Sequence, residues 1–185
     1  FEHIKEKFGT GRERKTEIRN FEQIEVAQVV NANTKLYANY EEGFVGTSLK
    51  KAEFVCDCSD IDDIIVFLQD GTFKVSKISD KAFFGTNIIH IGIFRKNDER
   101  TIYNVAYRDG KTNVTYIKRF PATGITRDKE YNVTLGTPKT KIMYFSANPN
   151  GEAEIVKVYL RQDLHLRKPI FEVDFSTLAI KGKLS

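Results

Sequence analysis

Basic side chains recur at comparable places along this chain, each time in a strand-like run that follows a turn-forming segment. The recurring residues are Lys50 and Lys51, Lys74 and Lys77, Lys118 and Arg119, and Lys157. Lysine often protects an exposed sheet edge, and that role explains any one position. Repetition at several places is better explained by an extended polyanion, because each cation that meets a phosphate releases counterions and the contributions add. Such contacts need no base-reading side chain.

The charge of the whole chain is mildly basic, with a formal net charge of +4. Its distribution is uneven: residues 53–63 carry acids without a Lys or Arg, whereas residues 108–141 are rich in both. A solvated surface explains either stretch, and a basic rim facing phosphates is the sharper interpretation. The side chains expected to contact phosphate are Lys50, Lys51, Lys74, Lys77, Lys118, Arg119, Arg127 and Lys129.

Residue types that could support catalysis or bind a metal lack the required spacing. Cys56 and Cys58 share a face if they lie on a strand, but no second cysteine pair completes a zinc site, so we expect both in the core. The acids at residues 60–63 lack the glycine and glutamate of a calcium loop, which favours a turn role. The three histidines are scattered, and no nucleophile elbow or phosphate loop is present. We therefore expect no catalytic residue, metal or cofactor in this chain.

The elements that carry these residues are expected to be strands. The chain has 14 Phe, 8 Tyr and no Trp, and Val, Ile and Thr are frequent, a composition typical of sheets. No apolar run of about 18 residues is present, so no transmembrane helix is expected. No long helical pattern interrupts the strand-like runs after residue 24, which argues against a parallel βαβ architecture.

A hairpin unit repeats three times, and its turn glycines, Gly71, Gly110 and Gly151, lie 39 and 41 residues apart. The predicted hairpins are residues 64–69 with 72–77, 103–108 with 111–116, and 142–147 with 154–159. A weaker copy at residues 36–45 precedes them. Gly85 and Gly124 each follow a turn glycine by 14 residues, which predicts a second turn at the same place in each unit. A strand repeat near 40 residues indicates the blades of a propeller-like array.

The ends of the chain differ from its centre. Residues 1–20 are expected to be the end of a helix and a linker, because apolar residues recur at helical spacing only up to Phe8 and polar residues follow. Residues 21–185 are expected to form one all-β domain. The last segment, residues 178–185, is expected to begin a further, incomplete blade.

Several segments resemble one known family. Residues 4–18, with Phe-Gly followed by Arg-Lys-Thr-Glu-Ile, resemble the segment that leaves the coiled coil in the A subunit of bacterial type IIA topoisomerases. Residues 114–120, with Tyr-Ile-Lys-Arg, resemble a hairpin strand of the C-terminal domain of DNA gyrase and topoisomerase IV, and residues 64–77 resemble its companion hairpin. Residues 180–183 are similar to the start of a following blade.

This resemblance implies a β-pinwheel, here of about four four-stranded blades that exchange strands. It implies a non-catalytic domain that binds and bends double-stranded DNA on a basic rim and presents a duplex segment to an ATP-dependent strand-passage core. The parent enzyme would be an A-subunit homodimer with an ATPase B subunit in the bacterial cytoplasm, associated with the nucleoid and not with a membrane. ATP and Mg²⁺ would bind elsewhere, and the DNA-cleaving tyrosine would lie upstream of this domain.

The sequence departs from the family pattern in three ways. The Gln-Arg-Arg-Gly-Gly-Lys-Gly type of box found in gyrase is absent, which favours topoisomerase IV over gyrase. Thr115 stands where a glycine usually precedes Tyr116. About four units are predicted where the family has five or six, so the array would be open or truncated.

The alternative function is that of a propeller that binds a protein partner and not nucleic acid. A third possibility, an enzyme, would need acids or histidines at equivalent blade positions, and these are not found.

Overall fold

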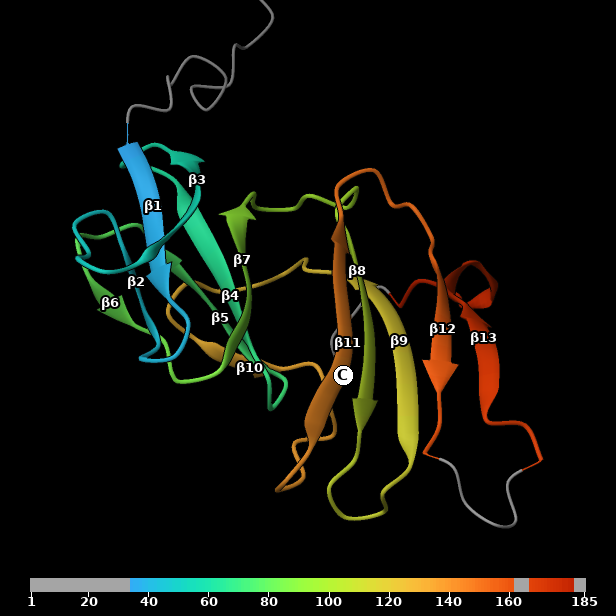
Figure 1. Cartoon of the computed structure of the whole chain (residues 1–185). Coiled ribbons are helices and arrows are strands. Elements are labelled where there is room, and N and C mark those ends of the chain that lie inside the picture. The colour runs from blue at the N-terminus through green and yellow to red at the C-terminus, as the bar shows by residue number, and fades with distance from the viewer. Residues whose placement is uncertain (1–33, 162–166, 182–185) are drawn as a thin grey trace, which may run out of the picture. The chain divides into compact units, whose positions relative to one another are not determined.

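A computed structural model describes residues 34–161 and 167–181, and these residues form an all-β structure (Figure 1). The chain divides between Asn31 and Ala32, so all described residues belong to its second unit. The N-terminal helix and the predicted boundary at residue 20 lie outside the described residues. No helix among the described residues is long and apolar enough to cross a membrane.

The described residues form thirteen strands and one single-turn helix. The elements are β1 (Thr34–Asn39), β2 (Phe44–Gly46), β3 (Glu53–Cys58), β4 (Asp63–Leu68), β5 (Thr72–Lys77), β6 (Ala82–Phe83), β7 (Ile88–Phe94), β8 (Ile102–Arg108), β9 (Thr115–Pro121), β10 (Glu130–Asn132), β11 (Lys141–Asn148), β12 (Ile155–Tyr159), β13 (Ile170–Asp174) and the single-turn helix η1 (Phe175–Thr177).

The strands form four small antiparallel sheets. Sheet A has the order β3-β1-β2-β6, sheet B β10-β5-β4-β7, sheet C β11-β8-β9 and sheet D β12-β13. The expected all-β class is confirmed, and the four sheets are consistent with the blades of a β-pinwheel. Within the described residues, however, only sheets A and B have the four strands that the sequence led us to expect.

Strands are exchanged between successive repeats. β6 follows β5 in the chain but pairs with β2, and β10 follows β9 but pairs with β5. Lys181 occupies the corresponding place in sheet C, because its backbone N–H donates to the carbonyl of Arg119 in β9 at 2.9 Å. The C-terminal segment therefore lies along β9 at Lys181, and residues 182–185 of the expected incomplete blade lie outside the described residues. Each repeat thus completes the sheet of the preceding one.

The strands of two of the three strong hairpin predictions pair as expected, and so do those of the weak one. β4 pairs with β5, β8 with β9, and β1 with β2. In the second hairpin, however, the predicted turn at Asp109-Gly110 and the strand at residues 111–116 are wrong: β9 begins at Thr115, and residues 109–114 form the turn. Asp109 closes this longer turn, because its N–H donates to the carbonyl of Val114 at 2.9 Å and its carboxylate accepts from the N–H of Thr112 at 2.8 Å.

The predicted hairpin of residues 142–147 with 154–159 is wrong: both strands exist, but β11 pairs with β8 and β12 pairs with β13. The physical reason is that β8 offers a free edge along which β11 pairs over its full length, from Lys141 to Asn148.

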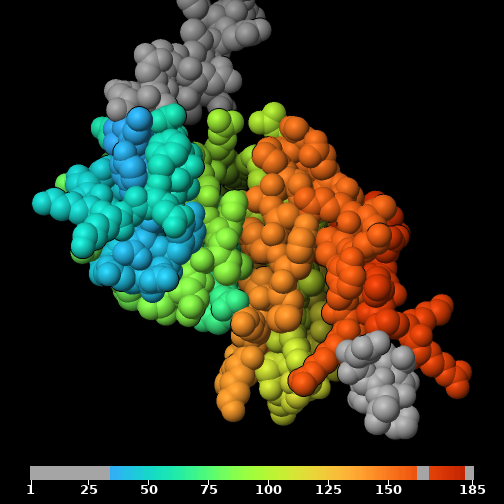
Figure 2. All heavy atoms as spheres, in the orientation of Figure 1, coloured from blue at the N-terminus to red at the C-terminus, as the bar shows by residue number. Residues whose placement is uncertain are grey.

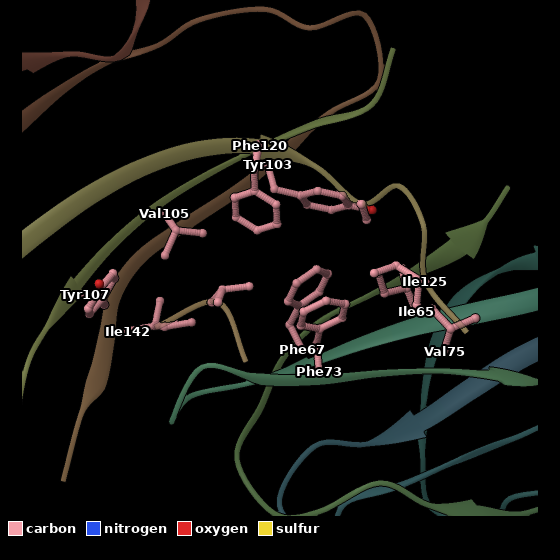
Figure 3. Close-up of a cluster of buried hydrophobic side chains, with 12 residues drawn as sticks. Ile65, Phe67, Phe73, Val75, Tyr103, Val105, Tyr107, Phe120, Ile125 and Ile142 are labelled. Carbon is pink, nitrogen blue, oxygen red and sulfur yellow. The ribbon is translucent and has the colours of Figure 1, made fainter. Parts of the chain in front are cut away.

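The hydrophobic core is layered between the sheets. One cluster joins sheets A and B through Leu36, Val45, Ile64, Val66 and Ile91, among others. A second joins sheets B and C, and Figure 3 shows its side chains meeting from β4, β5, β8 and β9. β4 is apolar without alternation because its successive side chains enter the two clusters in turn. Sheet B is therefore held on both faces.

The layer between sheets C and D is polar where the others are apolar. Asn104 of β8 donates to Ser146 of β11 at 3.3 Å, and Ser146 donates to the carboxylate of Glu154, just before β12, at 2.6 Å. Tyr144 also donates to Glu154. The guanidinium of Arg119 donates to the carbonyl of Gly151. Sheet D is thus attached mainly by hydrogen bonds and by the buried Phe175.

Turn glycines allow the chain to cross closely over the hairpin ends. Gly71 has φ +94°, and a Cβ there would lie 2.3 Å from a methyl group of Thr134. A Cβ on Gly110 would lie 2.0 Å from the carbonyl oxygen of Pro138. Because both glycines lack a Cβ, the loop of residues 133–140 can pass close to them as it runs from the β4–β5 hairpin to the β8–β9 hairpin.

Candidate nucleic-acid interface

Neighbouring sheets contact each other at the edge formed by β3, β7 and β11, and most predicted phosphate-contacting residues lie toward the other edge. β3 of sheet A contacts β7 of sheet B, and His90 in β7 lies 5.1 Å, ring to ring, from Phe145 in β11. The opposite edges of sheets A and B are formed by β6 and β10. Arg127 and Lys129 precede β10, and Lys74 and Lys77 lie on β5, which pairs with β10. Lys50 and Lys51 lie between β2 and β3, and Lys50 lines a surface hollow with Lys81, which directly precedes β6. We name these six of the eight predicted residues the basic edge: Lys50, Lys51, Lys74, Lys77, Arg127 and Lys129.

In sheet B the basic edge is built from β5 and from the segment that enters β10. Asp128 fixes this segment: its N–H donates to the carbonyl of Val75 at 2.7 Å, and its carboxylate accepts from the Ser76 hydroxyl at 2.6 Å. Arg127 and Lys129 flank Asp128 in the sequence and are exposed. They are thereby held next to the lysines of β5, although 50 residues separate the two segments in the chain.

Two cations of the basic edge have carboxylate partners in exposed positions. Arg127 pairs with Asp63 at 2.8 Å, and this contact raises the pKa of the guanidinium. Lys74 lies 3.9 Å from Asp128. The side chains of Arg127 and Lys74 are 53% and 38% exposed, and water screens ion pairs at such positions. Lys74 can therefore exchange the exposed Asp128 for a phosphate oxygen at little cost.

In sheet A the basic edge has the same construction. Thr47 and Ser48 follow β2, and their N–H groups donate to the carbonyls of Ser79 and Asp80 at 3.2 and 3.1 Å. The next residues, 49–51, bring Lys50 and Lys51 to the segment that enters β6, and both side chains are exposed. The cations thus stand where a second hairpin strand ends and a closing strand begins, as in sheet B.

Lys81 belongs to the same place and was missed by sequence reasoning. It directly precedes β6, its ammonium lies 4.1 Å from the ring centre of Phe44, and it lines a surface hollow together with Lys50. The only signal in the sequence is one lysine before three apolar residues, Ala82-Phe83-Phe84. A two-residue strand gives no periodicity by which that lysine could have been placed.

Lys118 is set back from the basic edge. Its side chain is half-buried, and its ammonium donates to the carbonyl of Val133 at 3.4 Å and lies 5.4 Å from the ring centre of Phe120. Burial lowers the pKa of this lysine, and the nearby charge of Lys181 lowers it further. Its contacts hold the segment after β10 against sheet C.

Arg119 is buried, with 8% of its surface exposed. Its guanidinium donates to Gly151, and its backbone carbonyl accepts from Lys181. Arg119 therefore joins three segments of the chain inside the layer between sheets C and D. The structure separates Arg119 from the exposed cations with which the sequence grouped it.

The other chemistry-bearing residues have structural surroundings. Cys58 is buried and Cys56 half-buried; burial raises the pKa of both thiols, that of Cys58 to about 11, so neither is a thiolate at neutral pH. Asp62 accepts from the N–H of Ser59 at 2.9 Å, which is the expected turn role. Among the described residues, no three His, Cys, Asp or Glu side chains gather as a metal site.

Comparison with known proteins decides the family. A family model described as the topoisomerase C-terminal domain of Bacteroidota matches residues 35–185. The chain belongs to this family. The A subunit of DNA topoisomerase 4 from Borreliella burgdorferi (strain ATCC 35210) is 32% identical over 144 residues, which cover 77% of this chain and 22% of that protein. No solved structure matches the chain.

The family resemblance read from the sequence is therefore confirmed: this is a C-terminal domain of a type IIA topoisomerase A subunit. The match includes sheets A to D and both parts of the basic edge. The chain spans about a fifth of the length of this topoisomerase relative.

Proposed function

We propose that this topoisomerase C-terminal domain binds and bends double-stranded DNA along the basic edge and presents the duplex to a strand-passage core. The observation that carries the proposal is the repeated placement of cations: in sheets A and B alike, exposed lysines gather where the second hairpin strand ends and the closing strand begins. One blade offers only a few phosphate contacts. Successive blades offer a track whose contributions add.

The proposed contacts are independent of DNA sequence. Lysine ammonium groups at an exposed edge bind phosphate oxygens and read no base edge. Bending a site of about 20–30 base pairs costs roughly 1–6 kcal/mol, which several phosphate contacts must offset. The exposed pair of Lys74 with Asp128 leaves this lysine free to rearrange toward DNA.

The larger assembly follows from the same proposal. The A subunit would form a homodimer with an ATPase B subunit in the bacterial cytoplasm, at the nucleoid. ATP and Mg²⁺ would bind outside this domain, and the domain itself would supply no catalytic group. The absence of the gyrase-type box favours topoisomerase IV.

Binding and bending can be tested with one doubly labelled duplex of about 40 base pairs, long enough to span several blades. We expect the anisotropy to rise on addition of the domain, and the fluorescence transfer between the duplex ends to increase. Two duplexes of unrelated sequence should give the same affinity. No change in anisotropy would reject the proposal in favour of a protein-binding propeller.

The assignment to topoisomerase IV has a separate test. The full-length A subunit, combined with its ATPase partner, should unlink and relax DNA in the presence of ATP. Supercoiled plasmid and linked circles are the substrates for these two activities. Relaxed plasmid is the substrate for the discriminating reaction, and with it we expect no negative supercoils. ATP-driven negative supercoiling would assign the parent protein to gyrase.

A further inference from the structure

A second basic surface lies at the hairpin end of sheets B and C, apart from the basic edge. We name it the hairpin-end surface, and its residues are Arg108, Lys111, Lys139 and Lys141. All four side chains are exposed. They come from the end of β8, from the β8–β9 turn and from the segment that enters β11. In Figure 2 the yellow-green β8–β9 turn and the orange segment near residue 140 project together at the lower margin.

Two of these cations oppose each other directly. Lys141 of β11 is the cross-strand partner of Arg108 of β8. Like charges in opposed positions of an antiparallel pair are destabilising. The ion pairs of the described residues include neither side chain. An anion bound between the two would remove this repulsion.

The nearby carboxylates are engaged by the turns themselves. Asp109 accepts from the N–H of Thr112 at 2.8 Å and also from the hydroxyl of Thr137, and these hydrogen bonds lower its pKa to about 2. Asp70 accepts from the N–H and the hydroxyl of Thr72, at 2.8 and 2.6 Å. Asp109 is therefore buried with hydrogen bonds to both of its oxygens, and Asp70 is engaged through Oδ1. On the basic edge, by contrast, acids pair directly with Arg127 and Lys74.

The surface is also hollowed and held in shape. Lys139 and Lys141 line a hollow of about 280 Å³, completed by Gln69, Asp70, Thr86, Asn87 and Thr140. Gln69 fixes it from two sides: its carbonyl accepts from the N–H of Ile142 at 2.7 Å, and its N–H donates to the carbonyl of Asn87 at 3.0 Å. Cations around a preformed polar hollow are suited to phosphate oxygens.

We infer that the hairpin-end surface binds the phosphate backbone of a second DNA duplex, so that one domain holds two duplex segments. The inference rests on the proposed function, which supplies nucleic acid as the source of phosphate. β5 runs from Thr72 at the hairpin end to Lys77 at the other end, a length of about 17–20 Å for its six residues. The two surfaces therefore lie at opposite ends of the strands.

The test uses the ¹⁵N-labelled chain of residues 1–185 and a duplex of about 12 base pairs. We expect two duplexes to bind per chain, with shifts in the amide signals of Asn87 and Thr140 as well as those of the basic edge. The variant Lys139→Gln/Lys141→Gln should bind one duplex, lose the shifts at Asn87 and Thr140, and lower the salt slope of binding by about 2. The matched variant Lys74→Gln/Lys129→Gln should lose only the shifts at the basic edge.

The outcomes separate this inference from the proposed function. Shifts at the basic edge alone, or a single duplex touching both surfaces, would overturn the inference and leave the proposed function intact. Shifts at Asn87 and Thr140 with tripolyphosphate, but not with duplex, would assign the surface to a smaller polyanion and overturn the duplex assignment. Absence of duplex binding at both surfaces would overturn both.

Discussion

At the scale of single residues, burial distinguishes the cations of this domain. Arg119 and Lys129 carry the same charge, yet Arg119 is buried against Gly151 whereas Lys129 is exposed beside β10. A buried guanidinium organises the fold, and an exposed ammonium at a sheet edge is available to a ligand. In the sequence Arg119 directly precedes Phe120 and Lys129 lies two residues before Tyr131, a similar setting that does not separate the two cations.

Replacement of Arg119 should therefore affect stability and not DNA affinity. Arg119→Ala removes a buried hydrogen-bonding group, and we expect the free energy of unfolding to fall by about 2–3 kcal/mol. Urea denaturation measures this loss. At temperatures where the variant is folded, the salt slope of DNA binding should equal that of the parent. The matched variant Lys129→Ala should show the reverse, an unchanged urea midpoint and weaker binding.

His90 should make stability depend on pH. It packs against Phe67, Tyr103 and Phe145, and burial lowers its pKa to about 4. The unfolded chain takes up a proton below about pH 6.5, whereas the folded chain does so only near pH 4, so stability falls between these values as the pH is lowered.

Between about pH 7 and pH 5 this histidine should cost about 2 kcal/mol of unfolding free energy. Urea denaturation at intervals across that range measures the slope. His90→Leu should remove most of it. An equal slope in the variant would show that other groups titrate.

At the scale of elements, strand exchange explains what the sequence could and could not reveal. The hairpins β4–β5 and β8–β9 are local, and an Asp-Gly pair with flanking apolar residues suffices to predict that their strands pair. It does not predict the length of the β8–β9 turn, which spans residues 109–114. β6 and β10 have only two and three residues, which is too short to show a hydrophobic periodicity. Their partners, β2 and β5, belong to the preceding repeat, so no local turn signal predicts the pairing. The expected equivalence of Gly85 and Gly124 fails for this reason: Gly85 follows the closing strand β6, whereas Gly124 precedes β10.

The candidate site was predictable to a similar degree. Lys74 and Lys77 lie on a predictable hairpin strand, so their place could be inferred. Lys81 could not be placed, because its position depends on a strand that pairs across repeats. The burial of Arg119 depends on contacts with Gly151 and Lys181, about 30 and 60 residues away in the chain, which no local pattern contains.

The crossing of loop 133–140 over Gly110 provides a test at this scale. Gly110→Ala would place a methyl group against the backbone of Pro138, and we expect a loss of about 2 kcal/mol or more and displacement of Lys139. Gly124→Ala is the matched control: no atom lies within 4 Å of its added Cβ, so only its φ of +69° opposes the change, at a cost of about 1 kcal/mol. Thermal unfolding of both variants measures the difference.

At the scale of the whole described unit, the layers between sheets differ in kind. Sheets A, B and C are joined by apolar clusters, whereas sheet D is joined by a polar layer and exposes Ile155, Tyr159 and Ile170. We expect backbone amides of β12 and β13 to exchange hydrogen at least tenfold faster than those of β4. Native-state hydrogen exchange followed by NMR measures both sets. Equal protection would show that the polar layer holds sheet D as firmly as the apolar clusters hold sheet B.

The central claim is that the basic edge binds duplex DNA through its phosphates. The most direct test measures how the dissociation constant for a duplex of about 40 base pairs depends on salt, from about 50 to 200 mM. It compares the parent chain with the triple variant Lys74→Gln/Lys77→Gln/Lys129→Gln. We predict a steep loss of affinity with salt for the parent and a slope lower by about 3 for the triple variant, equally for all DNA sequences. A dissociation constant that does not change with salt, or identical slopes for the two proteins, would contradict the claim.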